Sequence, residues 1–206
     1  MKPRVISVDT ERGEARVHIH AAPNPQAALV LGHGAGGGVD APDLVAAHDA
    51  ALANDVTVAL VEQPYRVAGR RSSPPAHHLD PAWTTVLVHL RGNELSGLDV
   101  IAGGRSAGAR VACRTARDTS AAAVLCLAFP LQPPARKGKD PAPSRLDELQ
   151  AVSVPMLIVQ GESDQFGVPP ESDAWTLVTV AGNHGLKSDL PAVGAAVAAW
   201  LGDVVS

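Results

Sequence analysis

The chain has 206 residues, which is enough for one well-packed domain and too few for two. Its net charge of −4 argues against a nucleic-acid partner, because such proteins usually carry a basic face. No apolar run reaches membrane-spanning length, and the N-terminus lacks the apolar core of a signal peptide. We therefore expect one domain over residues 1–206, located in the cytoplasm, with no nucleic-acid and no membrane partner.

The apolar segments recur at the spacing of an alternating strand and helix fold. Residues 4–9 and 15–21 flank a polar turn and predict an antiparallel hairpin at one edge of a sheet. The further predicted strands, several of them apolar on both faces, are residues 27–32, 57–62, 98–103, 123–129, 155–161 and 175–181. The predicted helices between and after them are residues 42–53, 81–95, 107–117 and 192–200.

A Gly-x-Ser-x-Gly motif lies between a predicted strand and a predicted helix. Its members are Gly104, Ser106 and Gly108, and that context indicates a nucleophile elbow. The two glycines fit a steric requirement, since a turn this tight leaves no room for side chains on either side of the serine. We expect Ser106 to present its hydroxyl at the carboxyl end of the sheet.

Residues 130–145 break the alternating pattern, with five prolines and the basic residues Arg136, Lys137, Lys139 and Arg145. The prolines exclude a strand or a long helix. Because the segment follows a strand, we expect it on the catalytic edge. A solvated surface loop is the favoured interpretation, and a flap that contacts substrate is the alternative.

A serine nucleophile needs donors for the developing oxyanion. The turn over residues 33–38, His-Gly-Ala-Gly-Gly-Gly, follows a strand and resembles the glycine-rich turn that supplies one such donor in esterases. Ala35 is our first choice for this N–H group and Gly36 the second, with the N–H of Ala107 as the other donor. The pattern G-x-G-x-x-G over residues 32–37 also fits a dinucleotide site, but the next helix begins too late and carries acidic residues at its start.

The serine also needs a base and a carboxylate that orients the base. Asp164 lies in the loop after the strand 155–161 and is preferred to its neighbour Glu162, because it stands deeper in that loop. His184 follows the last strand and lies downstream of both Ser106 and Asp164. We expect His33 to brace the glycine turn and the other six of the eight histidines to be surface or packing residues.

The order Ser, Asp, His along the chain is that of α/β-hydrolases. We therefore predict an α/β-hydrolase fold, a three-layer α/β/α sandwich with a mostly parallel sheet of about eight strands and no substantial lid domain. The two cysteines, Cys113 and Cys126, lie in apolar segments and are expected to be buried free thiols; a disulfide between them is the alternative. The predicted chemistry requires no metal and no organic cofactor.

With these residues assembled, the chain resembles small, lidless, dienelactone-hydrolase-like members of the α/β-hydrolase superfamily. It is more closely similar to a group that contains a testis-expressed hydrolase-like protein and a subunit of a nuclear histone-acetyltransferase complex. The segments that carry this resemblance are residues 33–38, 62–66, 104–108, 129–131 and 160–167. The resemblance implies a hydrolase, but some relatives of this group serve as interaction subunits.

We therefore expect a serine hydrolase of small carboxylic esters or thioesters, with Ser106, His184 and Asp164 as catalytic residues. The alternative is a non-catalytic interaction module that keeps the hydrolase fold. Gly36, Arg66 and Arg105 are candidate substrate-binding residues, and the two arginines would favour an acidic acyl group. Surface ion pairs are at least an equal explanation for these arginines.

Overall fold

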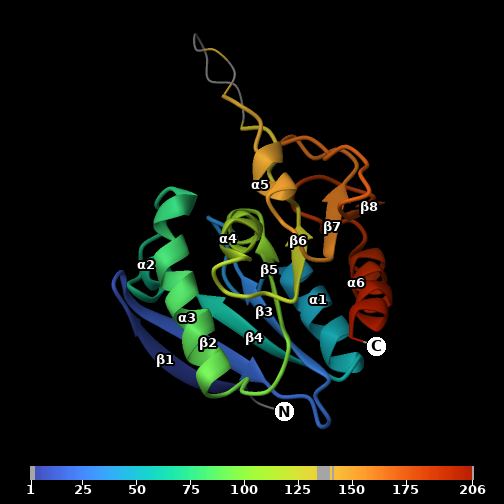
Figure 1. Cartoon of the computed structure of the whole chain (residues 1–206). Helices are drawn as coiled ribbons and strands as arrows, with labels where there is room; N and C mark the ends of the chain where they lie inside the picture. The colour runs from blue at the N-terminus through green and yellow to red at the C-terminus, as the bar shows by residue number, and fades with distance from the viewer. Residues whose placement is uncertain (1–2, 134–139, 141, 206) are drawn as a thin grey trace.

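The protein is a three-layer α/β/α sandwich (Figure 1). The computed structural model describes residues 3–133, 140 and 142–205. Eight strands form one sheet in the order β1-β2-β4-β3-β5-β6-β7-β8. The strands are β1 Arg4–Thr10, β2 Gly13–His20, β3 Ala27–Gly32, β4 Val56–Glu62, β5 Val100–Arg105, β6 Ala123–Leu127, β7 Met156–Gly161 and β8 Thr176–Val180. The predicted fold class is confirmed.

Two pairs of long helices cover the two faces of the sheet (Figure 1). Helices α1 (Pro42–Ala53) and α6 (Leu190–Val204) pack on one face, and α3 (Asp80–Gly92) and α4 (Ala107–Thr115) on the other. The shorter elements are α2 (Pro64–Val67), the 3-10 turn η1 (Ala76–His78) and α5 (Leu146–Gln150). No helix among the described residues combines the length and apolarity that a membrane crossing needs.

The sheet is antiparallel only at the N-terminal edge. Strands β1 and β2 form the predicted hairpin, and β2 pairs antiparallel with β4. From β4 to β8 every neighbouring pair is parallel, so the carboxyl ends of these strands meet at one edge. Strand β2 alternates buried and partly exposed side chains, whereas all six residues of β3 are buried, as expected for a central strand with helices on both faces.

The structure shifts several predicted boundaries. Strand β5 begins at Val100 rather than residue 98 and continues to Arg105, because Gly97, with φ of 83°, completes a turn just before it. Strand β6 stops at Leu127, since Ala128 adopts a positive φ of 49° that leaves the strand. Helix α6 is longer than predicted at both ends. These shifts bring the end of β5 directly up to Ser106.

The two cysteines come from α4 and β6 and face each other inside the core. Cys113 and Cys126 are both buried free thiols, with their Sγ atoms 3.4 Å apart. The hydrogen bond with the Cys113 thiol, together with burial, raises the pKa of Cys126, so this thiol stays protonated. The prediction of buried free thiols is confirmed.

Candidate active site

Ser106 occupies a strained turn between β5 and α4. Its backbone has φ of 52° and ψ of −106°, values that a residue with a side chain rarely adopts. The Ser106 N–H donates to the carbonyl of Leu127 at 2.9 Å, which fixes the turn to the end of β6. The strain is therefore held by the neighbouring strand, and the serine lies at the carboxyl edge of the sheet.

The glycines beside the serine meet the steric requirement that the sequence predicts. A Cβ atom on Gly104 would lie 2.5 Å from the carbonyl oxygen of Gly32, and one on Gly108 would lie 2.3 Å from the same oxygen. Both distances are below any acceptable contact. The end of β3 thus passes directly against the elbow, and only residues without a side chain allow it.

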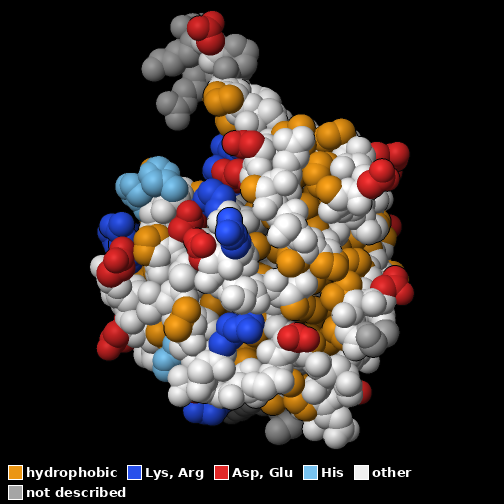
Figure 2. All heavy atoms as spheres, viewed as in Figure 1, with side chains coloured by type: hydrophobic (Ala, Val, Ile, Leu, Met, Phe, Trp, Pro, Cys, Tyr) orange, Lys and Arg blue, Asp and Glu red, His pale blue; other side chains and the backbone are white. Residues whose placement is uncertain are grey.

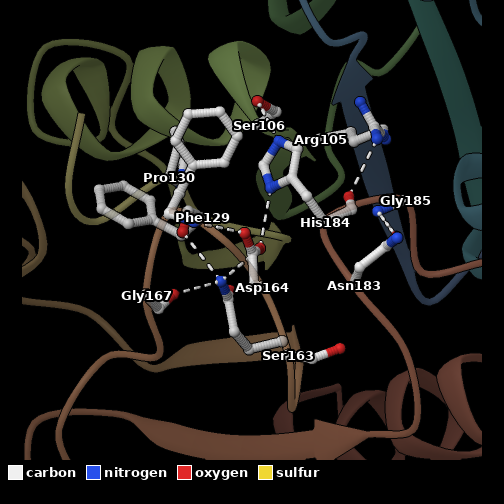
Figure 3. Close-up of polar contacts among 12 residues, drawn as sticks. Arg105, Ser106, Phe129, Pro130, Ser163, Asp164, Gly167, Asn183, His184 and Gly185 are labelled. Carbon is white, nitrogen blue, oxygen red and sulfur yellow. Dashed lines mark hydrogen bonds and ion pairs between the residues drawn. The ribbon is translucent and has the colours of Figure 1, made fainter. Parts of the chain in front are cut away.

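His184 lies in the loop after β8, on the side of the elbow toward the β8 edge. A Cβ on Gly161 would be 2.5 Å from the carbonyl oxygen of Asn183, so this loop packs against the end of β7. From there the imidazole reaches Ser106, with Nε2 2.9 Å from Oγ (Figure 3). The base candidate and the nucleophile candidate, 78 residues apart in the chain, are within hydrogen-bond distance.

Asp164 supports the far side of the imidazole. Its Oδ2 lies 2.8 Å from Nδ1 of His184, and its side chain is completely buried (Figure 3). A carboxylate at Nδ1 requires a proton there, which leaves Nε2 free to accept from the Ser106 hydroxyl. Glu162, the competing carboxylate, is exposed to solvent.

A buried amide that the sequence analysis did not single out holds Asp164. Gln160 is the next-to-last residue of strand β7. Its Nε2 donates to Asp164 Oδ2 at 2.8 Å and to the carbonyls of Phe129 and Gly167 at 3.1 and 2.9 Å. The backbone N–H of Phe166 donates to the other carboxylate oxygen at 2.9 Å. A lone glutamine inside an otherwise apolar strand was the sequence signal for this role.

The aromatic ring of Phe166 packs on the imidazole of His184. The ring centroids are 4.4 Å apart, and the planes are inclined by 58°. This contact shields one face of the imidazole from solvent and restricts its rotation. The imidazole is thus held by the carboxylate at its edge and by an aromatic ring at its face.

The glycine-rich turn after β3 is braced by its first residue, as predicted. His33 is buried, its Nδ1 donates to the carbonyl of Gly34 at 2.9 Å, and its Nε2 accepts from the N–H of Gln63 at 3.1 Å. Burial lowers the pKa of His33, and the positive charge of Arg66 lowers it further. The neutral ring therefore serves as a fixed link between the ends of β3 and β4.

Ala35, Ala107 and Ser106 line one hollow at the carboxyl edge, with a volume of about 550 Å³. No acceptor for the N–H of Ala35 or Ala107 lies within the described part of the chain, so both donors are available. The hydroxyl of Tyr65 donates to the carbonyl of Ala35 at 3.1 Å and steadies that turn. Gly36 lines an adjoining hollow of about 420 Å³ and does not border the one with Ser106.

The two arginines suggested for substrate binding have other surroundings. A terminal nitrogen of Arg105 donates to the carbonyl of His184 at 3.0 Å (Figure 3). Its Nε lies 2.8 Å from Asp43 Oδ2. Arg66 lies on α2 beside His33. Neither side chain lines the hollow with Ser106.

Asp43, the partner of Arg105, lies at the start of α1. Its side chain is 1% exposed, and burial raises its pKa, although the charge of Arg105 opposes this effect.

Helix α1 begins at Pro42, several residues after Gly37, so the third glycine of the dinucleotide pattern lies outside the helix. Within the described residues, no group of three His, Cys, Asp or Glu side chains is placed to hold a metal ion.

Comparison with known proteins agrees with this arrangement. A family model described as an alpha/beta hydrolase domain matches residues 25–189. The chain belongs to this α/β-hydrolase family. No curated protein matches the sequence significantly.

Solved structures share the fold at low sequence identity. A serine hydrolase without a lid from Xanthomonas campestris has a TM-score of 0.77 at 17% identity, covering 98% of this chain and 95% of that one. Est1E from Butyrivibrio proteoclasticus has a TM-score of 0.78 at 16% identity and 98% coverage of both chains. A dienelactone hydrolase from Anabaena variabilis has 0.72 at 16%, covering 98% and 99%. These α/β-hydrolases share the architecture from end to end.

Proposed function

We propose that the protein is a serine hydrolase of small carboxylic esters or thioesters that acts through an acyl-enzyme. The observation that carries the proposal is the continuous chain of hydrogen-bond contacts from Asp164 through His184 to Ser106. This chain ends at a hollow of about 550 Å³, within the size range of small-molecule sites. The family, and structural neighbours that include an esterase domain from Rhodothermus marinus, support hydrolysis.

In the first half of the reaction, the Oγ atom of Ser106 attacks the carbonyl carbon while its proton passes to Nε2 of His184. Asp164 stabilises the resulting imidazolium through Nδ1. The carbonyl oxygen, now carrying negative charge, accepts from the N–H groups of Ala35 and Ala107. The C–O or C–S bond then breaks, and the departing alcohol or thiol takes the proton from Nε2.

In the second half, water attacks the acyl-enzyme and gives its proton to Nε2 of His184. The same two N–H groups stabilise the second oxyanion. When the bond to Ser106 breaks, Oγ regains the proton from the imidazolium and the free acid leaves. All proton transfers in this scheme use His184, so no metal or organic cofactor is required.

The test is steady-state hydrolysis of 4-nitrophenyl esters and acyl thioesters by the intact protein. We expect Ser106→Ala and His184→Ala each to lower kcat by about 10⁴-fold or more, because the residues act as one unit. Ser153→Ala, which removes an exposed hydroxyl elsewhere, is the matched control and keeps the wild-type rate. Hydrolysis that survives Ser106→Ala would contradict the proposed nucleophile, and a folded wild-type protein that hydrolyses none of these substrates would favour a non-catalytic interaction module.

The closer relationship to the group with a testis-expressed protein and an acetyltransferase-complex subunit stays a prediction. Such relatives supply the rival function, because a protein can keep the fold after losing catalysis. In this chain Ser106, His184 and Asp164 are all present, and His184 contacts both of the others. That contact is what favours the catalytic alternative.

A further inference from the structure

One wall of the hollow beside Ser106 is cationic. Arg110 from α4 and Arg145, directly before α5, line it together with Pro130 and Phe166. Ala35 and residues 73–77, Ser-Pro-Pro-Ala-His, also line the hollow. In Figure 2, basic and acidic side chains gather between α3, α4 and α5, beside this region. The hollow thus offers apolar walls and a concentration of arginine on one side.

Arg110 is already neutralised. Its guanidinium makes a bidentate contact with the carboxylate of Glu148 on α5, with Nε 2.8 Å from Oε2. Arg114 lies one turn further along α4, and one of its terminal nitrogens is 3.3 Å from Oε1 of the same Glu148. Arg114 also makes a bidentate contact with Asp80. Two carboxylates therefore serve two arginines, and none is left for a third.

Arg145 is that third arginine. One terminal nitrogen donates to the carbonyl of Pro130 at 2.7 Å, and its backbone N–H donates to the carbonyl of Leu131 at 2.9 Å. Both contacts hold Arg145 against the segment that follows β6, where Pro130 lines the hollow. The side chain is therefore positioned by neutral carbonyl groups.

No carboxylate lies within 4 Å of Arg145 in the part of the chain that the structure describes. The residues outside that part are 1–2, 134–139, 141 and 206, and none of them is Asp or Glu. Burial and the charge of nearby Arg110 lower the pKa of Arg145, while Glu148 opposes this effect. A guanidinium keeps its proton under such conditions, so the wall of the hollow carries an unneutralised positive charge.

We propose that Arg145 binds an anionic group of the substrate, so that the protein prefers esters or thioesters that carry a carboxylate. The inference rests on the proposed hydrolase function and names its substrate class. A partly buried guanidinium, most of whose N–H donors have no partner among the described residues, is suited to a carboxylate, which accepts two parallel hydrogen bonds from it. The anion would supply the carboxylate partner that Arg145 lacks among the residues that the structure describes.

This assignment moves the anion site away from the arginines that the sequence suggested. Arg105 is engaged with Asp43 and the carbonyl of His184, and Arg66 lies away from the hollow. It also gives a role to one end of the basic, proline-rich segment 130–145. Of its other bases, Arg136, Lys137 and Lys139 lie outside the described residues.

The test compares carboxylated and neutral substrates in matched pairs. For the acyl side, the pair is mono-4-nitrophenyl glutarate and 4-nitrophenyl pentanoate, which have acyl chains of equal length. For the alcohol side, the pair is 4-acetoxybenzoate and phenyl acetate. Because intrinsic reactivities within a pair differ, the decisive quantity is the ratio of kcat/KM values in each variant relative to the same ratio in the wild type.

We expect Arg145→Gln to lower this ratio about tenfold or more for at least one pair, because it removes a charge-assisted hydrogen bond. Arg145→Lys should keep part of the preference, since it keeps the charge and loses the fork. Arg117→Gln removes an equal charge from an exposed position and should leave the ratio unchanged. In the wild type the preference should decline as salt is raised from about 0.05 to 0.5 M.

The outcomes separate the two proposals. If neutral esters are hydrolysed and neither ratio falls in Arg145→Gln, the anion site is wrong and the hydrolase function stands. If Arg117→Gln lowers the ratio as much as Arg145→Gln, the effect is one of net charge and the assignment to Arg145 is overturned. If Ser106-dependent hydrolysis is absent for every substrate, the hydrolase function itself fails.

Discussion

The two sides of the hollow at Ser106 differ in how their polar groups are partnered. On the β7 and β8 side, both carboxylate oxygens of Asp164 have partners within the chain, since they accept from His184, Gln160 and the N–H of Phe166. On the side of α4 and α5, Arg110 and Arg114 share two carboxylates, and Arg145 pairs with none among the described residues.

This difference in partners distinguishes groups that keep a fixed geometry from groups that are suited to binding substrate. Groups that must hold one geometry throughout a reaction gain from fixed internal partners, because reorganisation during the reaction is avoided. A group that binds substrate needs a hydrogen-bond donor without a partner in the protein, so that an acceptor on the ligand can pair with it. Variants of the first side should therefore change kcat, and variants of the second should change discrimination between substrates.

Gln160→Met should give the largest effect on the preorganised side. It removes the donor to Asp164 and leaves the carbonyls of Phe129 and Gly167 without that partner. We expect kcat to fall about 10- to 100-fold with little change in KM, because the carboxylate and the imidazole lose their fixed geometry. The free energy of unfolding should fall by about 1–3 kcal/mol, measured by urea denaturation.

The matched control is Gln150→Met, since Gln150 is exposed on α5 and should leave both quantities unchanged. Rates are compared per folded molecule, so that lower stability is not mistaken for a lower kcat. A Gln160→Met protein with the wild-type kcat per folded molecule would show that Asp164 does not need this amide.

Arg105→Met should have a smaller effect on rate and a distinct effect on stability. The variant leaves the buried carboxylate of Asp43 unpaired, so we expect a loss of about 3 kcal/mol in the free energy of unfolding. It also removes the donor to the carbonyl of His184, and kcat should fall about tenfold because the loop that carries the base is less restrained.

The double variant Arg105→Met with Asp43→Asn separates the two effects. Replacing the buried charge should restore most of the stability, while the donor to the His184 carbonyl remains absent and kcat stays low. Recovery of kcat together with stability would mean that Arg105 acts only on folding, and the positioning role would be wrong.

His33→Gln should produce the smallest effect, which depends on pH. The pKa of His33 is lowered in the folded protein, whereas the unfolded chain takes up a proton near the ordinary value of 6.5. Wild-type stability should therefore fall as the pH decreases through and below that value. The variant has no imidazole at position 33 that could take up a proton on unfolding. Between pH 7 and 5 its free energy of unfolding should therefore decrease by about 1 kcal/mol less than that of the wild type.

Urea denaturation at several pH values measures this difference, with His78→Gln at an exposed position as the control. Equal pH profiles for His33→Gln and the wild type would contradict the account of His33 as a neutral internal link.

Much of the fold and the order of the candidate site could be predicted because they depend on local patterns. The strands from β3 to β8 are short apolar runs, and the elbow requires glycines at 104 and 108 for a steric reason that any sequence must meet. Ser106, Asp164 and His184 each follow a strand, and parallel strands bring their carboxyl ends together. The order of these three residues along the chain then leaves few alternative assignments of nucleophile, carboxylate and base.

The contacts made by Gln160 and Arg105 could not be predicted from such patterns. Gln160 meets Asp164 only because the loop after β7 folds back over the strand, and Arg105 meets Asp43 across two elements that are distant in sequence. The position of Arg145 depends on how its segment returns to Pro130. Each of these contacts is set by tertiary packing, for which neither periodicity nor spacing gives a signal.

The central claim is that Ser106 is the nucleophile activated by His184. Its most direct test is labelling of the intact protein with a fluorophosphonate, followed by mass spectrometry of the digested protein to locate the adduct. We predict one adduct, on Ser106, which is absent in Ser106→Ala and forms far more slowly in His184→Ala. Failure of the folded wild type to react, or an adduct on another residue, would contradict the account.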